Sequence, residues 1–159
     1  MVRERCPDDA LGVDFSGNNH RHPVRCLLAD DSEPVRSALA SLLGGEGIEV
    51  VGQAASGFEA LVLLEELPTT VVLLDVRMPD LNGLDVARRA AEILRKKLAI
   101  VFYTSYADPG FVREALDAGA RGVVLKDAPP SNLLDALDEV GHGGVYLDPR
   151  LRPSTESTR

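Results

Sequence analysis

Aromatic residues are scarce in this sequence. Tryptophan is absent, and aromatic residues make up 4% of the chain, while apolar residues as a whole make up 45%. A core built from such a chain must consist mainly of aliphatic side chains, which suits an α/β fold rich in Val, Leu and Ala. The 159 residues are enough for one ordinary domain with a core of its own.

Positive charge and cysteine are also in short supply. The chain has 17 Lys and Arg against 25 Asp and Glu, a net charge of −8, so we expect it to bind no nucleic acid itself. Cys6 and Cys26 show no metal-ligand spacing, and Cys26 lies in an apolar run where a buried free thiol is expected. No apolar run is long enough to cross a membrane, and the N-terminus lacks the apolar core of a signal peptide. We therefore expect a cytoplasmic protein without a membrane partner.

The composition changes twice along the chain. Residues 1–23 are polar and follow neither a helical nor a strand period, which predicts a disordered N-terminal extension. Residues 24–149 carry regular apolar patterns and form the predicted domain. Residues 150–159 are polar again and are predicted to be a short C-terminal tail.

Within the domain, short apolar runs alternate with helical patterns. The apolar runs lie at residues 24–29, 48–54, 71–74, 98–103 and 122–125. The helical patterns follow them at residues 33–43, 57–67, 84–96, 109–118 and 130–140. This alternation predicts a doubly wound parallel sheet with right-handed crossovers. The run at 48–54 alternates between apolar and polar residues, which favours an edge strand and the flavodoxin-like sheet order 2-1-3-4-5.

Polar residues follow four of these runs at the point where each ends. Asp30 and Asp31 follow the first run, Asp75 the third, Thr104 the fourth and Lys126 the fifth. The predicted strand order brings the acids together at the topological switch point, where open α/β sheets bind ligands.

Three carboxylates in one place either take up protons or bind a cation, and an all-oxygen site suits Mg²⁺. A carboxylate can also attack phosphorus and form an aspartyl-phosphate, a reaction that depends mainly on positioning and charge neutralisation. Lys126 supplies a positive charge for such a group, and the Thr104 hydroxyl can donate a hydrogen bond to it. Singly, each of these residues has an ordinary explanation, such as a helix cap or a surface lysine; their joint placement favours a site.

Over residues 24–149 the sequence resembles the receiver domains of two-component response regulators. The features that carry the resemblance are the Asp30-Asp31 pair, Asp75 with Pro79 and Gly83 after it, Thr104 and Lys126. The stretches at 115–120, 125–127 and 144–149 are most similar to receivers of the LuxR/NarL-type class. That class normally carries a DNA-binding domain, and only about ten residues follow Pro149, too few for such a domain. We therefore expect either a stand-alone receiver or one whose output domain has been lost or removed.

The resemblance implies a role for each residue at the site. Asp75 would accept a phosphoryl group from a sensor histidine kinase. Asp31 and Asp75 would bind Mg²⁺ directly, Asp30 would act through water, and Arg77 would contribute its backbone carbonyl. Lys126 would pair with the phosphoryl group.

The resemblance also implies a switch, with one departure from the family pattern. Thr104 would move toward the phosphoryl group, and the change would alter the surface available for homodimerisation or for a target protein. The family usually has an aromatic residue three positions before the lysine, where this chain has Val123. Arg77 and Tyr106 stand two positions beyond Asp75 and Thr104, and their bulk suggests a long-lived phosphorylated state.

Two other classes of function stay open beside the switch. One is an Asp-nucleophile phosphohydrolase; haloacid-dehalogenase-type enzymes carry a second acid two residues after the nucleophile, and Arg77 at that position argues against turnover. The other is an adaptor with a receiver fold that works without phosphorylation. Val123 favours the adaptor, whereas the complete acidic site counts against it because unused carboxylate clusters cost stability.

Overall fold

The computed structural model describes residues 24–94 and 98–152 of the chain. The predicted disordered extension at 1–23, the predicted helical residues 95 and 96, and residues 153–159 of the predicted tail lie outside the described residues.

The described chain alternates between strands and helices, as the apolar patterns predict. The strands are β1 (Arg25–Ala29), β2 (Glu49–Ala54), β3 (Val71–Leu74), β4 (Ala99–Thr104), β5 (Gly122–Leu125) and β6 (Tyr146–Leu147). The helices are α2 (Glu33–Gly45), α3 (Gly57–Glu66), α4 (Gly83–Leu94), α5 (Pro109–Asp117) and α6 (Pro130–Gly141), and a 3₁₀ turn, η1, spans Pro149–Leu151.

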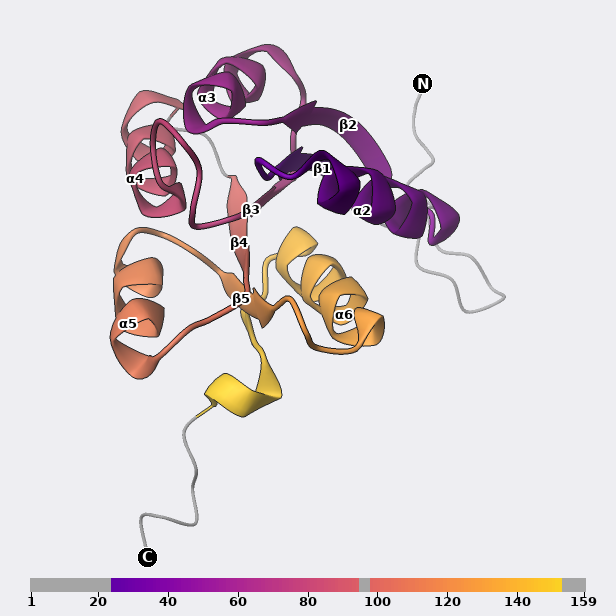
Figure 1. Cartoon of the computed structure of the whole chain (residues 1–159), viewed down its shortest axis with the longest axis vertical. Helices are drawn as coiled ribbons and strands as arrows, with labels where there is room; N and C mark the ends of the chain where they lie inside the picture. Colours follow the sequence, from indigo (N-terminus) through magenta and orange to yellow (C-terminus); the bar gives the residue numbers. More distant parts are fainter. Residues whose placement is uncertain (1–23, 95–97, 153–159) are drawn as a thin grey trace, which may run out of the picture.

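The strands form one parallel sheet in the order β2-β1-β3-β4-β5-β6. The predicted order of the first five strands is therefore confirmed. Figure 1 shows the sheet between two layers of helices, with α3, α4 and α5 on one side and α2 and α6 on the other. All residues of β3 and β5 are buried, whereas β2 is largely half-exposed, as its edge position requires.

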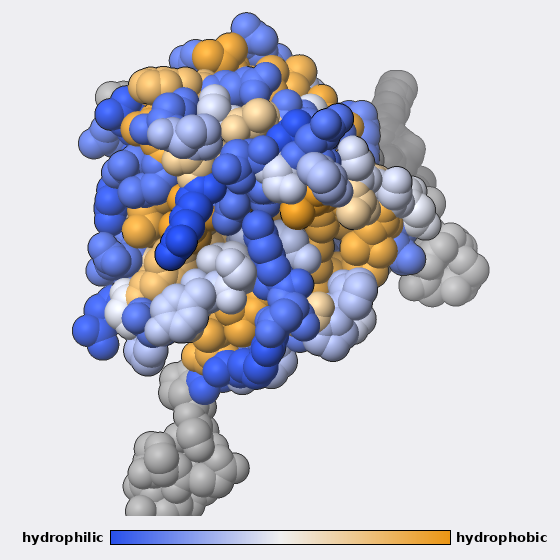
Figure 2. All heavy atoms as spheres, viewed as in Figure 1, coloured by the Kyte–Doolittle hydropathy of each residue, from blue (hydrophilic) through white to orange (hydrophobic). Residues whose placement is uncertain are grey.

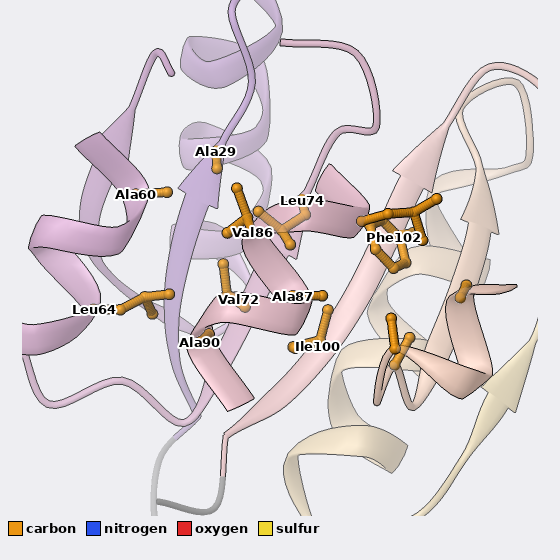
Figure 3. Close-up of a cluster of buried hydrophobic side chains, with 14 of the residues drawn as sticks. Ala29, Ala60, Leu64, Val72, Leu74, Val86, Ala87, Ala90, Ile100 and Phe102 are labelled. Carbon is orange, nitrogen blue, oxygen red and sulfur yellow. The ribbon is translucent and has the colours of Figure 1, made fainter. Parts of the chain in front are cut away.

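Each face of the sheet has its own aliphatic core. On the side of α3, α4 and α5 the core includes Leu64, Leu74, Val86 and Phe102, and Figure 3 shows these side chains gathered between the helices and the strands. Phe102 contacts Phe111 edge-on, with ring centroids 5.5 Å apart. The second core lies under α2 and α6 and contains Cys26, whose thiol is fully buried as predicted.

Helix α4 departs in detail from a simple helical period. The spacing of Leu84, Ala87 and Ala90 would also bury Ala91, but Ala91 is exposed and Val86 is fully buried. The reason is that the first turn of α4 packs closely against α3: a Cβ atom at Gly57 would lie 2.9 Å from the Val86 side chain.

The sixth strand is an addition to the predicted sheet. β6 is only two residues long and pairs Tyr146 with Gly122 and Leu147 with Val123. Two residues are too few to show a strand period, and Gly143 and Gly144 interrupt the apolar pattern before them; the chain turns at Gly143, whose φ is +98°. The short strand extends the sheet beyond β5, the strand that carries Lys126 at its end.

Figure 2 shows a surface covered mostly by hydrophilic residues, with hydrophobic residues gathered in smaller areas between them. Among the described residues, no helix is both long and apolar enough to cross a membrane.

Candidate functional site

The carboxyl ends of β1, β3, β4 and β5 lie side by side, and backbone hydrogen bonds fix the residues that follow them. The Asp75 amide donates to the Ala29 carbonyl at 2.9 Å, which holds the end of β3 against β1. The Lys126 amide donates to the Thr104 carbonyl at 2.7 Å, which holds the end of β5 against β4. The sheet therefore brings Asp75, Thr104 and Lys126 to its carboxyl end.

Three carboxylates meet there. Asp30, Asp31 and Asp75 each offer an oxygen atom, and these atoms lie within 4.8 Å of one another. Asp30 is buried, Asp75 is partly buried and Asp31 is exposed, so the group opens from the core toward solvent. The Ser32 amide donates to Asp30 Oδ1, and the Val76 amide donates to Asp75 Oδ1, each at 2.8 Å. Two of the three acids are thus held by neighbouring backbone amides.

Lys126 lies across two of these acids. Its Nζ is 2.8 Å from Asp30 Oδ2 and 3.4 Å from Asp75 Oδ2. Burial alone would lower the pKa of Lys126, but the hydrogen bond to Asp30 and the charge of Asp75 outweigh it, so the pKa is raised and the ammonium form is favoured. Burial, followed by repulsion from Asp30, raises the pKa of Asp75 despite the nearby Lys126. The site therefore carries uncompensated negative charge and favours a further cation.

Thr104 takes part in a hydrogen-bonded turn of its own. Its hydroxyl donates to the Tyr106 carbonyl at 3.0 Å, and the Tyr106 amide lies 3.3 Å from the same hydroxyl oxygen. Thr104 is buried, whereas 72% of the Tyr106 side chain surface is exposed. Val123 is fully buried in the core, within β5, and Arg77 is exposed in the loop that follows Asp75.

The loop after Asp75 depends on a close backbone contact at Gly83. The Gly83 amide donates to the Val76 carbonyl at 2.8 Å. A Cβ atom at Gly83 would collide with the Asp75 carbonyl oxygen and lie 2.9 Å from the Phe102 ring. A glycine at this position therefore lets the loop close over the end of β3.

Two side chains that support the site were missed by sequence reasoning. Asp80, in the loop after Asp75, accepts hydrogen bonds from the amides of Gly57, Phe58 and Leu81, which lowers the pKa of its carboxyl group to about 2. It ties that loop to the start of α3. Arg36, in α2, donates to the Asp30 carbonyl. No local pattern marks either contact, although an Asp next to a proline is a common turn signal.

Comparison with known proteins identifies the family. The family model of the response regulator receiver domain matches residues 26–138, which include the three clustered acids, Thr104 and Lys126. The chain belongs to this family. The resemblance to the receiver domains of response regulators is thereby confirmed.

Two curated relatives are longer than the region they share with this chain. It is 38% identical to the transcriptional regulatory protein UhpA of Escherichia coli over 137 residues, which cover 86% of this chain and 68% of UhpA. It is 34% identical to the transcriptional regulatory protein LnrK of Bacillus subtilis over 129 residues, or 80% of this chain and 58% of LnrK. The chain thus spans less than two thirds of LnrK.

Among solved structures, a LuxR-family two-component response regulator from Aurantimonas superposes on this receiver domain with a TM-score of 0.78 at 28% identity. The superposition covers 81% of this chain and 92% of that one. The LuxR-type receiver fold therefore extends over nearly all of the described residues.

Proposed function

We propose that this receiver domain is a phospho-accepting signalling switch in which Asp75 takes a phosphoryl group from a sensor histidine kinase. The observation that supports the proposal most strongly is the cluster at the end of β3. Asp75 has one carboxylate oxygen held by the Val76 amide and the other facing Lys126, with Asp30 and Asp31 beside it. Family membership supports the same role.

The carboxylate oxygens of this cluster fit Mg²⁺, which prefers oxygen ligands and keeps part of its water shell. Asp31 and Asp75 would bind the ion directly, Asp30 would act through water, and the Arg77 carbonyl would complete the protein ligands. Bound there, Mg²⁺ would neutralise charge on the phosphoryl oxygens. The exposed position of Asp31 leaves that side of the cluster open to a hydrated ion and to the kinase.

In the proposed transfer, a carboxylate oxygen of Asp75 forms a bond to phosphorus while the bond from phosphorus to the donor histidine nitrogen breaks. The electron pair of the broken bond returns to the imidazole. Val76 fixes the orientation of the carboxylate, and Lys126 carries the positive charge that the arriving phosphoryl oxygens require.

The product carries more negative charge than the carboxylate it replaces, by analogy with other phosphorylated side chains. Lys126 then moves its hydrogen bond from Asp30 to the phosphoryl group. The Thr104 hydroxyl exchanges the Tyr106 carbonyl for a phosphoryl oxygen, which releases the turn between β4 and α5. The resulting shift changes the surface that a second copy of the chain or a target protein would contact.

Arg77 and Tyr106 follow Asp75 and Thr104 by two residues each, and both are exposed. We propose that their side chains hinder water from attacking the acyl phosphate. A long-lived phosphorylated state follows from this arrangement.

The test is the mass of the intact protein after incubation with acetyl phosphate, with and without Mg²⁺. The wild type is expected to gain one phosphoryl group only with Mg²⁺, and Asp75→Asn is expected to gain none. Asp117→Asn is the matched control, since Asp117 is the exposed last residue of α5 and therefore lies at the end of the sheet opposite the cluster, and it should react like the wild type. A folded wild type that gains no mass would contradict the proposal and favour a phosphorylation-independent adaptor.

A further inference from the structure

The chain after α6 returns to the edge of the sheet and contacts β5 just before Lys126. We call residues 146–152, which comprise β6, η1 and the residues beside them, the C-terminal strap; it is the yellow segment near β5 and α6 in Figure 1. The Tyr146 amide donates to the Arg121 carbonyl at 2.8 Å, and the Asp148 amide donates to the Val123 carbonyl at 2.9 Å. The strap thus continues the ladder of backbone hydrogen bonds along β5.

The ladder would next require a backbone carbonyl opposite the Leu125 amide. The Lys126 amide points to β4, where it donates to Thr104, so the preceding amide of Leu125 points to the strap. The strap turns away at Pro149, and the Asp148 side chain takes the place of the missing carbonyl: its Oδ2 accepts from the Leu125 amide at 3.2 Å. Asp148 is fully buried.

The other carboxylate oxygen of Asp148 fixes the strap itself. Asp148 Oδ1 accepts from the Arg150 amide at 3.1 Å and lies 3.5 Å from Arg150 Nε. The Arg150 guanidinium in turn makes two hydrogen bonds to Asp127, at 2.7 and 3.3 Å. The residues on both sides of Lys126 are therefore bound to the strap, Leu125 through Asp148 and Asp127 through Arg150.

We propose that Asp148 is a positioning residue of the phosphorylation site, which acts through the Leu125 amide to hold the backbone from which Lys126 reaches Asp30 and Asp75. This inference rests on the function proposed above. Asp30 and Asp31 follow β1 and Asp75 follows β3, and neither strand contacts β6 in the sheet. Loss of Asp148 should therefore slow phosphorylation without weakening the binding of Mg²⁺ by the acids.

The experiment compares three substitutions at the strap. Asp148→Ala removes both acceptors. Asp148→Asn keeps one oxygen, which suffices for the buried Leu125 amide. Arg150→Gln breaks the contacts to Asp127 and leaves the bond from Leu125 to Asp148 intact. Thr69→Ala is the matched control, because Thr69 precedes β3 at the amino end of the sheet, away from the cluster, and its hydroxyl donates to the Leu67 carbonyl.

The first readout is the rate of phosphorylation by acetyl phosphate as a function of Mg²⁺ concentration. Asp148→Ala should lower the rate at saturating Mg²⁺ by about tenfold, since small displacements of a positioned group have effects of this order. The Mg²⁺ concentration for half-maximal rate should not exceed about twice that of the wild type, and Asp148→Asn, Arg150→Gln and Thr69→Ala should each keep the rate within about threefold. An Asp148→Ala protein as fast as the Thr69→Ala control, or Asp148→Asn as slow as Asp148→Ala, would overturn the proposal.

The second readout needs no phosphorylation. In the unmodified protein, hydrogen exchange of the Leu125 amide is compared with that of the Lys126 amide, which keeps its bond to Thr104 as an internal reference. Asp148→Ala should speed exchange at Leu125 by about tenfold relative to Lys126, as expected when one hydrogen bond is lost. An unchanged ratio would overturn the role of Asp148. If Asp148→Ala does not fold, Asp148→Ser replaces it, because a serine hydroxyl still serves the nearby Arg150 amide and is too short to reach Leu125. A wild type that takes no phosphoryl group would contradict the proposed function, and the exchange ratio would still decide whether Asp148 holds β5.

Discussion

Replacing Lys126 with methionine measures how strongly this ammonium group holds the acidic cluster together. Methionine keeps most of the apolar stem of the lysine and removes its charge. At the 2.8 Å and 3.4 Å separations from Asp30 and Asp75, Coulomb's law with an effective dielectric constant of about 20 gives attractions of about 6 and about 5 kcal/mol. The cost of taking the charges out of water offsets much of this, and removing one partner of a buried pair lowers stability by about 3–5 kcal/mol in practice.

The expected result for Lys126→Met is a loss of about 3 kcal/mol in the free energy of unfolding without metal at pH 7, near the lower end of that range because Lys126 remains 24% exposed. The assay is urea unfolding in the presence of a chelator. The loss of stability in Lys126→Met should shrink as the pH falls, because protonation of Asp75 removes its repulsion with Asp30. At the same Mg²⁺ concentration, the ion should stabilise the variant more than the wild type. The gain for the variant reaches about 2.7 kcal/mol when the Mg²⁺ concentration is a hundred times the dissociation constant of the variant.

The matched control is Arg88→Met. Arg88 is half-exposed and lies 3.5 Å from Asp85 and 3.8 Å from Glu114, and surface pairs of this kind contribute about 0–1 kcal/mol. If Lys126→Met cost no more than Arg88→Met in the absence of metal, the conclusion that Lys126 offsets the charge of the cluster would be wrong.

Three further predictions concern the loops around the cluster. Asp80→Asn should make the stability of the protein less sensitive to acid, as measured by acid unfolding followed by circular dichroism. The pKa of Asp80 is lowered to about 2 in the folded protein. The stability that its carboxylate contributes is therefore present above the ordinary carboxyl pKa of about 4 and is lost as the pH falls toward 2. An acid transition identical to that of the wild type would contradict this. Gly83→Ala should lower the free energy of unfolding by about 1–3 kcal/mol in urea, because its methyl group would collide with the Asp75 carbonyl and crowd Phe102; a variant as stable as the wild type would show that the loop adapts at no cost. The double variant Arg77→Ala, Tyr106→Ala should lose its phosphoryl group several-fold faster than the wild type, measured as the decay of the phosphorylated mass after removal of acetyl phosphate. An equal decay rate would exclude these side chains as the cause of a long-lived state.

The position of the cluster could be predicted because it depends on topology more than on distance along the chain. Asp30 and Lys126 are separated by 96 residues and form a hydrogen bond. When apolar runs that each end in a polar residue are joined by right-handed crossovers, those polar residues all lie at the carboxyl end of a parallel sheet. The alternating pattern of β2 predicted an edge strand. With β2 at the edge, the flavodoxin-like strand order places β1 beside β3.

The contacts that steady the cluster could not be predicted in the same way. Asp80 contacts the start of α3, and Asp148 contacts the Leu125 amide 23 residues before it. Each is a side chain that satisfies a backbone amide on another element, and neither the helical nor the strand period carries information on such pairs. Asp148 belongs to the stretch that resembles LuxR/NarL-type receivers, but its burial depends on the pairing of β6 with β5, which the sequence pattern did not predict.

Both groups that respond in the proposed mechanism are already engaged in this structure. Lys126 lies closer to Asp30 than to Asp75, and the Thr104 hydroxyl donates to Tyr106. A phosphoryl group on Asp75 must therefore compete with these contacts, and its added charge makes it the stronger acceptor for both donors. Val123 has no ring to fill the space that Thr104 leaves, so a swinging aromatic side chain at that position cannot transmit the change. The direct link between the two responding residues is the hydrogen bond from the Lys126 amide to the Thr104 carbonyl. Coupling through this backbone bond would make the switch depend on how firmly β5 is held, which is the property that the contact between Asp148 and Leu125 controls.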